Sequence, residues 1–158
     1  MKLVFIVGPT ASGKSHFALE SAKYLNTQKI KSEILNCDSL QVYKSVDIGT
    51  AKPTPAEMAS MPHWLFDFVE EKQTLTAGDY RKLALEKIKD RQKQGVEILF
   101  VVGGSGFYFH ALEHGMFDLG KVPEDIHNQV TQEAKKNLAA LFEELRQKDP
   151  DYAKKIGS

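Results

Sequence analysis

A glycine-rich stretch near the N-terminus constrains the fold more than any other feature of this sequence. It runs Gly8-Pro9-Thr10-Ala11-Ser12-Gly13-Lys14-Ser15 and matches every fixed position of the phosphate-binding pattern GxxxxGK[ST]. The apolar run Leu3–Val7 before it predicts a buried strand, and His16–Leu25 after it predicts a helix. A loop of this kind between a strand and a helix holds phosphate groups, so the sequence predicts an α/β protein that binds a polyphosphate.

The residue types in this loop predict the contacts that it makes. Glycines let successive backbone N–H groups point at an anion, and the helix that follows presents its positive end to the same place. We expect Lys14 to reach the terminal phosphate oxygens and the Ser15 hydroxyl to hold a Mg²⁺ ion that bridges them. The pattern leaves the identity of the polyphosphate open. The predicted phosphate-binding residues are Gly8, Thr10, Ala11, Ser12, Gly13, Lys14 and Ser15.

Composition narrows the class of protein. The 158 residues are 42% hydrophobic and 27% charged, which is ordinary for one soluble domain. The 21 basic and 21 acidic residues cancel, so a face that binds RNA would have to be local or be supplied by residues outside this chain. The single cysteine, Cys37, excludes an internal disulfide, and Leu3–Val7 is too short for a secretory signal or a membrane span. We expect a monomeric cytoplasmic protein without a membrane partner.

Strand and helix signals alternate along residues 1–120. This alternation predicts a P-loop NTPase-like parallel sheet flanked by helices. Thr76 and Asp79 form a capping-box pattern that starts a long helix, and Gly95 stops it. The further predicted elements are strands Glu33–Cys37, Trp64–Val69 and Ile98–Val102, a short helix near Ala56–Ser60 and a helix Phe107–Glu113.

A different pattern begins near Pro123, where only helical signals remain. They predict helices over Pro123–Lys136 and Leu138–Lys148, with Asn137 at the break between them. We therefore divide the chain into a P-loop α/β core, residues 1–120, and a helical segment, residues 121–158. We expect the segment to be the start of a longer helical region that is truncated here.

Three polar segments follow predicted strands, and parallel strands bring their carboxyl ends to one crevice. The segments are the phosphate loop, Asp38-Ser39 and Gly103–Ser105. Asp38 is the candidate general base, because a carboxylate facing the phosphates could take a proton from a nucleophile; a turn-forming role is the alternative. Ser105 is a candidate for contact with the reacting groups, and a helix cap is its alternative.

The strand Ile98–Val102 ends in Gly-Gly-Ser, whereas most nucleoside triphosphatases with this loop carry an aspartate that orders the magnesium shell. This difference weakens an ATPase interpretation. Asp67 could take that place, or it could hydrogen-bond to a neighbouring loop.

Five sequence blocks resemble the ordered motifs of the tRNA dimethylallyltransferases, the tRNA isopentenyltransferase family. The resemblance covers most of residues 1–115, and Asp149-Pro150 and Ala153–Ile156 are similar to a later family segment. The phosphate loop is generic, but the second and third blocks are specific to that family. The blocks are Gly8–Ser15, Asp38-Ser39-Leu40-Gln41-Val42-Tyr43, Asp47-Ile48-Gly49-Thr50-Ala51-Lys52-Pro53, Pro62-His63 and Val102-Gly103-Gly104-Ser105-Gly106-Phe107-Tyr108.

The resemblance implies a prenyl transfer from dimethylallyl diphosphate to the exocyclic N6 of an adenosine beside the tRNA anticodon. The phosphate loop would hold the diphosphate leaving group, with Lys14, Ser15 and Mg²⁺ neutralising its charge. Asp38 would take the proton from the attacking amine. The residues implied for the flipped-out base are Ser39, Leu40 and Gln41.

The sequence departs from the family pattern at two positions and in length. Ser105 stands where the family usually has threonine, and Trp64 replaces the second histidine after Pro62. Family members are also much longer. The alternatives are a small-molecule kinase that uses ATP with Asp38 as base, an adenylate isopentenyltransferase that uses free nucleotide, and a nucleotide-binding module without catalysis.

Overall fold

The structure is a computed structural model and describes residues 1–116 and 122–157. These residues belong to two compact units, Met1–Met116 and Phe117–Ser158. The predicted division at residues 120 and 121 lies outside the described residues and stays a prediction. The strands of the first unit are β1 (Lys2–Val7), β2 (Ser32–Asn36), β3 (His63–Trp64) and β4 (Ile98–Gly103).

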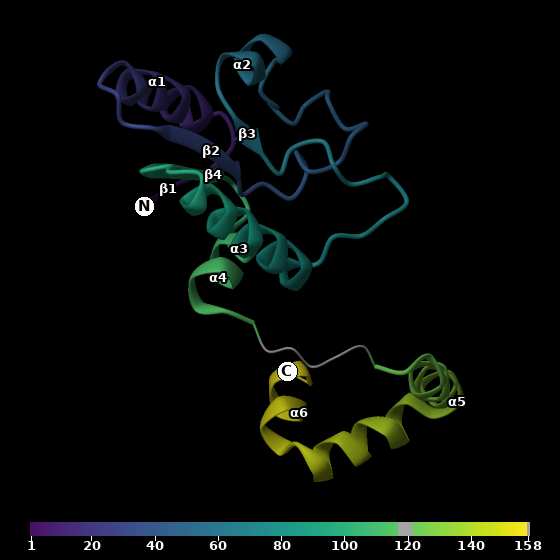
Figure 1. Cartoon of the computed structure of the whole chain (residues 1–158). Helices are drawn as coiled ribbons and strands as arrows, with labels where there is room; N and C mark the ends of the chain where they lie inside the picture. The colour runs from purple at the N-terminus through teal and green to yellow at the C-terminus, as the bar shows by residue number, and fades with distance from the viewer. Residues whose placement is uncertain (117–121, 158) are drawn as a thin grey trace. The chain divides into compact units, whose positions relative to one another are not determined.

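These strands form one parallel sheet in the order β1-β4-β2-β3 (Figure 1). The helices of the unit are α1 (Lys14–Thr27), α2 (Pro55–Ser60), α3 (Ala77–Lys93) and α4 (Gly106–His114). The predicted parallel α/β class is therefore confirmed.

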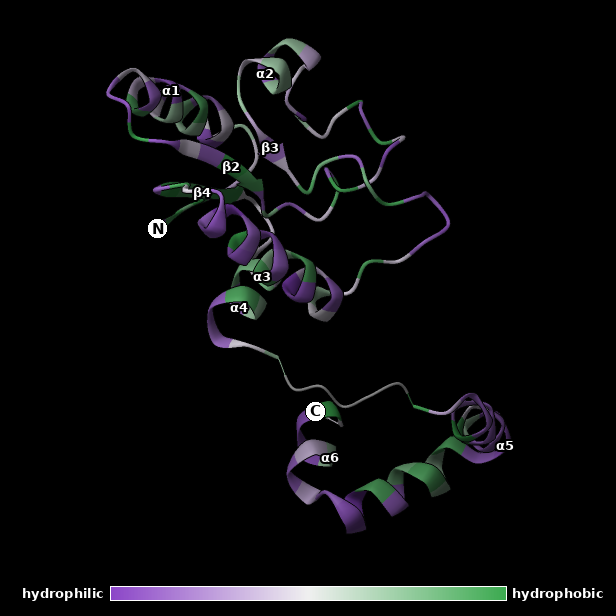
Figure 2. Cartoon of the chain, viewed as in Figure 1, coloured by the Kyte–Doolittle hydropathy of each residue, from purple (hydrophilic) through white to green (hydrophobic). Residues whose placement is uncertain are grey.

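Strand periodicity decides which helix covers which face of the sheet. Successive side chains of a strand point to opposite faces. Ile34, Phe100 and Val102 belong to the core cluster that α1 completes. Leu35 and Val101 belong to the other cluster, which α3 and α4 complete. β4 is thus covered on both faces, as its all-apolar sequence predicts, and Figure 2 shows it as hydrophobic.

The prediction of a buried first strand is wrong, because no residue of β1 is buried and only Phe5 and Ile6 are partly buried. Leu3, Val4 and Val7 are exposed. β1 pairs only with β4 and lies at the edge of the described sheet, and α1 packs mainly over β2 and β4. An apolar run shows that a strand can be buried, but the neighbouring elements decide whether it is.

The predicted strand Trp64–Val69 is also wrong in extent, because β3 ends at Trp64. Leu65 (φ 62°) and Asp67 (φ 52°) adopt left-handed backbone conformations, which cannot continue a strand. Val69 retains one isolated parallel bridge to Tyr43. The apolar composition of this segment reflects packing against the core rather than strand pairing.

The helix starts and stops follow local chemistry. At the start of α3, Thr76 accepts from the Asp79 N–H at 3.1 Å, and Asp79 accepts in return from the Thr76 N–H. This capping box confirms the predicted N-terminus, and Gly95 (φ 77°) follows the C-cap as predicted. α3 buries Tyr80, Ala84 and Ile88 in the core cluster on one face of the sheet.

The second unit contains α5 (Glu124–Lys148) and α6 (Pro150–Ile156). Non-helical dihedrals at Asn137 (φ −156°, ψ 85°) divide α5 in two, and the Asn137 side chain caps the second half by accepting from the Ala140 N–H. The predicted break is confirmed. Green and purple alternate along the C-terminal half of α5 in Figure 2, as in an amphipathic helix. Among the described residues, no helix is both long and apolar enough to cross a membrane.

Candidate functional site

The phosphate loop connects β1 to α1 and leaves the start of α1 open to an anion. Gly13 (φ 83°) is the N-cap residue and has no side chain to accept from the N–H groups of the first turn. Ala11 (φ 63°) provides a second left-handed position in the loop. The Lys14 ammonium folds back and donates to the Pro9 carbonyl at 2.6 Å, which holds its charge at the loop.

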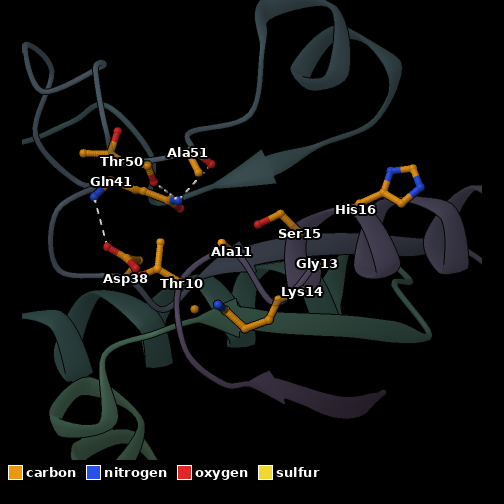
Figure 3. A pocket seen from close by; sticks show the side chains of 11 residues that line it. Thr10, Ala11, Gly13, Lys14, Ser15, His16, Asp38, Gln41, Thr50 and Ala51 are labelled. Carbon is orange, nitrogen blue, oxygen red and sulfur yellow. Dashed lines mark hydrogen bonds between the residues drawn. The ribbon is translucent and has the colours of Figure 1, made fainter.

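A cavity of about 280 Å³ opens beside this loop (Figure 3). Lys14 and Ser15 lie on one side of it, and Asp38 and Gln41 lie on the other. The structure thus brings together the phosphate loop, the end of β2 and the end of β4, as strand topology predicts. The lining residues are Thr10, Ala11, Gly13, Lys14, Ser15, His16, Asp38, Gln41, Thr50, Ala51 and Gly103.

Some predicted site residues do not line this cavity. Gly8 and Ser12 belong to the loop itself, and Ser39, Leu40 and Ser105 lie outside the lining. Conversely, sequence reasoning did not single out His16, Thr50 or Ala51 as site residues, and it placed Gly103 at the crevice only as part of the segment Gly103–Ser105. The block Asp47–Pro53 that contains Thr50 and Ala51 was the available signal for two of them.

Asp38 orders the turn that follows β2. Its Oδ1 accepts from the Leu40 N–H at 2.9 Å and from the Gln41 N–H at 3.4 Å. Its other oxygen, Oδ2, lies on the side of Gly104, where a Cβ would stand 3.4 Å away. The turn-forming role is therefore real, and it leaves the second oxygen directed toward the end of β4.

The close approach of β2 and β4 requires glycine at position 103. A Cβ on Gly103 would stand 2.0 Å from the Cys37 carbonyl oxygen, and this distance is too short for any residue that has a Cβ. Around this contact, Cys37 N–H donates to Val102 O at 2.7 Å and Ser105 N–H donates to Cys37 O at 3.2 Å. These bonds hold Asp38 beside the Gly103–Ser105 segment.

Gln41 connects Asp38 to the loop of residues 41–52. Its buried side chain donates through Nε2 to the Thr50 carbonyl at 2.8 Å and to the Ala51 carbonyl at 3.1 Å. The Thr50 hydroxyl in turn donates to the Val46 carbonyl at 2.9 Å. Both amide hydrogens of Gln41 are therefore engaged within the protein, and its Oε1 is the atom that can accept a further hydrogen bond.

Lys52 holds the same loop through three hydrogen bonds. Its Nζ donates to the Tyr43 carbonyl at 2.6 Å, to Asp47 at 2.8 Å and to Asp67 at 2.5 Å. Burial opposes the charged form, but the hydrogen bonds and charges of Asp47 and Asp67 outweigh it and raise the Lys52 pKa above its ordinary value. Of the two predicted roles of Asp67, the structure shows the hydrogen bond to a neighbouring loop.

Ser105 is the N-cap residue of α4. Its hydroxyl accepts from the Tyr108 N–H at 3.4 Å, which is the capping contact expected as the alternative to catalysis. Its role toward a substrate stays a prediction. Half-buried His63 uses Nδ1 to hydrogen-bond the Met61 carbonyl at 2.9 Å, and burial is the main cause that lowers its pKa.

Fold and site together define the class of protein. The first strand leads through a complete phosphate loop into a helix, and a carboxylate stands across the cavity at the end of the second strand. These features place the chain among proteins with a P-loop NTPase-like fold.

The chain belongs to the IPP transferase family, whose family model matches residues 41–158. A curated tRNA dimethylallyltransferase of Bdellovibrio bacteriovorus is 43% identical and covers 98% of this chain, which covers 48% of that relative. Another from Bifidobacterium longum is 39% identical, with 98% of this chain and 47% of the relative covered. The chain therefore spans about half the length of the curated relatives that it matches. The family resemblance predicted from the sequence blocks is confirmed.

Two solved structures confirm the fold. The full-length tRNA isopentenylpyrophosphate transferase of Bacillus halodurans is 37% identical, with a TM-score of 0.66 over 96% of this chain and 49% of that chain. A eukaryotic dimethylallyltransferase acting on tRNA is 27% identical, with a TM-score of 0.77 over 98% of this chain and 38% of that chain.

Proposed function

We propose that this chain carries the donor site and the general base of a tRNA dimethylallyltransferase. The reaction transfers the dimethylallyl group from dimethylallyl diphosphate to N6 of an adenosine next to the tRNA anticodon. The observation that supports it best is the cavity in which the phosphate loop faces Asp38 and Gln41 (Figure 3). Family membership makes prenyl transfer the chemistry that fits this arrangement.

In the proposed reaction the adenosine N6 forms a bond to C1 of the dimethylallyl group while the bond from C1 to the diphosphate oxygen breaks. The electron pair of that bond leaves with the diphosphate, and the phosphate loop and Lys14 stabilise the charge. The proton of the attacking amine goes to Asp38 Oδ2, because Oδ1 is already engaged by the turn. Gln41, held by two carbonyls, contacts the acceptor base, with Ser39 and Leu40 beside it.

Mg²⁺ fits the donor site as a proposed cofactor. The Ser15 hydroxyl lines the cavity next to the place of the phosphates, and Mg²⁺ in proteins keeps several waters and takes the remaining ligands from substrate phosphates. Bound there, it would neutralise the charge of the diphosphate. We further propose that the protein acts in the cytoplasm, as a monomer, with tRNA and dimethylallyl diphosphate as its partners.

The kinase alternative receives less support from the structure. A kinase of this fold would close arginines over the phosphates. Arg91 instead stacks over the Trp64 ring, 4.3 Å from its centre, and lies 3.9 Å from Glu33, while Arg146 pairs with Glu143 within α5. Free-nucleotide prenylation would use the same donor site with a different acceptor, and a nucleotide-binding module would use the phosphate loop without catalysis.

Calorimetry on the 158-residue chain tests the donor site. We expect dimethylallyl diphosphate with Mg²⁺ to bind more tightly than ATP, and Lys14→Ala to abolish binding because a charge-assisted phosphate contact is lost. Lys23→Ala is the matched control, since Lys23 lies partly exposed on the same helix and pairs with Glu20. Tighter binding of ATP would favour the kinase. Equal affinity of Lys14→Ala and Lys23→Ala for dimethylallyl diphosphate would show that the loop does not bind the donor.

Turnover is tested in a chimera that joins residues 1–158 to the part of the Bdellovibrio relative beyond its match. We expect the chimera to prenylate tRNA and Asp38→Asn to lower the rate by about 10²–10⁴ with donor affinity retained, because the amide cannot take the proton. An Asp38→Asn chimera with more than about half of the parent rate would show that Asp38 only forms the turn.

A further inference from the structure

Asn36 makes an unusual set of contacts for the last residue of a strand. It is 0% exposed, and its side chain uses both the carbonyl and the amide group within the protein. Oδ1 accepts from the Asp38 N–H at 2.9 Å, while Nδ2 donates to the Asp38 carbonyl at 3.2 Å and to the Leu65 carbonyl at 2.9 Å. One buried amide therefore holds both backbone polar groups of Asp38.

These contacts form the first of two consecutive turns of the same kind. The Asn36 side chain accepts from the N–H two residues later, at Asp38, and the Asp38 side chain accepts from the N–H two residues later, at Leu40. The first turn fixes the backbone from which the second begins. The orientation of the Asp38 carboxylate thus depends on the Asn36 amide.

The third contact of Asn36 ties this turn to a distant segment. Leu65, whose carbonyl accepts from Asn36, has a left-handed backbone conformation (φ 62°) directly after β3. The Asn36 side chain therefore cannot move toward Asp38 or away from it without losing a buried hydrogen bond. A buried amide that is fully satisfied in one arrangement and not in others specifies that arrangement.

We propose that Asn36 is a positioning residue that sets the orientation of the Asp38 carboxylate for proton transfer. The proposal rests on the proposed function, in which Asp38 is the base. Asn36 does not line the cavity and acts only through Asp38. Small errors in the position of a catalytic group cost up to about 100-fold in rate, so the loss of Asn36 affects turnover more than donor binding.

Tyr80 supplies a matched control at the same strand end. Its hydroxyl donates to the Asn36 carbonyl at 2.8 Å, and its ring stacks on Tyr108 with centres 4.2 Å apart. Tyr80→Phe removes the buried hydrogen bond to the Asn36 carbonyl and the contact of the same hydroxyl with the Cys37 thiol, and it leaves the contacts between the Asn36 side chain and Asp38. This variant therefore shows how a loss of stability at the end of β2 alone affects kcat and amide exchange.

The kinetic test compares three variants of the chimera. We expect Asn36→Ala to lower kcat at least about 10-fold with KM for dimethylallyl diphosphate within about two-fold, and Tyr80→Phe to change kcat by less than about two-fold. Asn36→Ser should recover part of kcat, because a serine hydroxyl can accept from the same N–H two residues later. If Asn36→Ala is too unstable to assay, the kcat of Asn36→Ser is compared with that of Tyr80→Phe, and a lower kcat for Asn36→Ser supports the positioning role.

Amide hydrogen exchange on the 158-residue chain gives a readout that does not need turnover. We expect Asn36→Ala to speed exchange at Leu40 and Gln41, whose N–H groups the Asp38 carboxylate holds, and Tyr80→Phe to leave both unchanged. Equal effects of Asn36→Ala and Tyr80→Phe on kcat and on exchange would overturn the positioning role. If Asp38→Asn keeps the parent rate, the proposed role of Asp38 as the base is refuted. If Asp38→Asn is inactive and Asn36→Ala is fully active, only the positioning role of Asn36 is refuted.

Discussion

Replacing Lys52 with methionine tests whether one buried ammonium group holds the loop of residues 41–52. The Lys52 side chain is only 6% exposed and donates to Tyr43, Asp47 and Asp67. Methionine keeps an apolar stem in the same space but donates no hydrogen bond. All three acceptors therefore lose a charged donor at once.

The expected loss depends on how far each acceptor can return to water. The Asp47 side chain is 72% exposed, so its pair contributes about 0–1 kcal/mol, as exposed ion pairs do. The Asp67 side chain is 38% exposed and the Tyr43 carbonyl is partly buried. Hydrogen bonds to a charged group contribute about 1.5–3 kcal/mol each, and re-solvation of Asp67 lowers its share. We expect Lys52→Met to reduce the free energy of unfolding by about 2–4 kcal/mol.

Urea unfolding of the 158-residue chain measures this loss against Lys44→Met. Lys44 also pairs with a carboxylate at 2.5 Å, on Glu70, but both side chains are exposed, so we expect a loss of about 0–1 kcal/mol. The two lysines share the same shortest pair distance and differ in burial and in the number of acceptors, which is three for Lys52 and one for the Lys44–Glu70 pair. Equal losses for the two variants would refute the argument that burial of Lys52 holds the loop.

The pH dependence gives a second check on Lys52. Its pKa is raised above its ordinary value in the folded state, so the folded state binds the proton more tightly than the unfolded state does. The stabilisation is fully present below the unfolded value and is lost as pH rises through the folded value. The difference in unfolding free energy between the parent and Lys52→Met should stay constant from neutral pH to about pH 10 and shrink above it.

Three further substitutions or reactions test single contacts of the site. Ser105→Ala should lower the free energy of unfolding by about 0.5–2 kcal/mol through loss of the α4 cap. If Ser105→Ala also lowers the rate of prenylation by about 10-fold or more, and Ser105→Thr stays near the parent rate, Ser105 contacts the transition state as well. Gly103→Ala should cost about 1–3 kcal/mol or more because its Cβ meets the Cys37 carbonyl, whereas Gly106→Ala, with open space at its Cβ, should be within about 1 kcal/mol of the parent. The Cys37 thiol, whose pKa burial raises to about 11, should resist alkylation at pH 8 in the folded chain and react at once in urea.

Local chemistry explains why much of the fold could be predicted from the sequence. The phosphate loop and the Thr76–Asp79 capping box are set by residues close together in the chain, so their patterns predict the structure directly. The parallel direction of the strands follows from the alternation of strands and helices along the chain. Asp38 could be predicted at the cavity for the same reason, because strand ends in a parallel sheet converge.

The parts that sequence reasoning missed depend on contacts between distant segments. The end of β3 depends on left-handed residues Leu65 and Asp67, whose partners Asn36 and Lys52 lie far away in the sequence. Burial of β1 depends on what packs over it. Asn36 did leave a signal, since it is a polar residue near the end of the predicted strand Glu33–Cys37 and stands two positions before an aspartate. The pattern could not show that its amide would be satisfied by three bonds.

Two separable devices therefore place Asp38, and substitutions should distinguish them. Gly103 sets how closely the end of β2 approaches β4, because its missing Cβ leaves room for the Cys37 carbonyl. Asn36 sets how the peptide groups of Asp38 turn once that approach is made. A Cβ at position 103 must move the strand end as a whole, so stability and turnover should fall together. Loss of the Asn36 amide frees only the turn, so turnover should fall further than the accompanying loss of stability alone would cause.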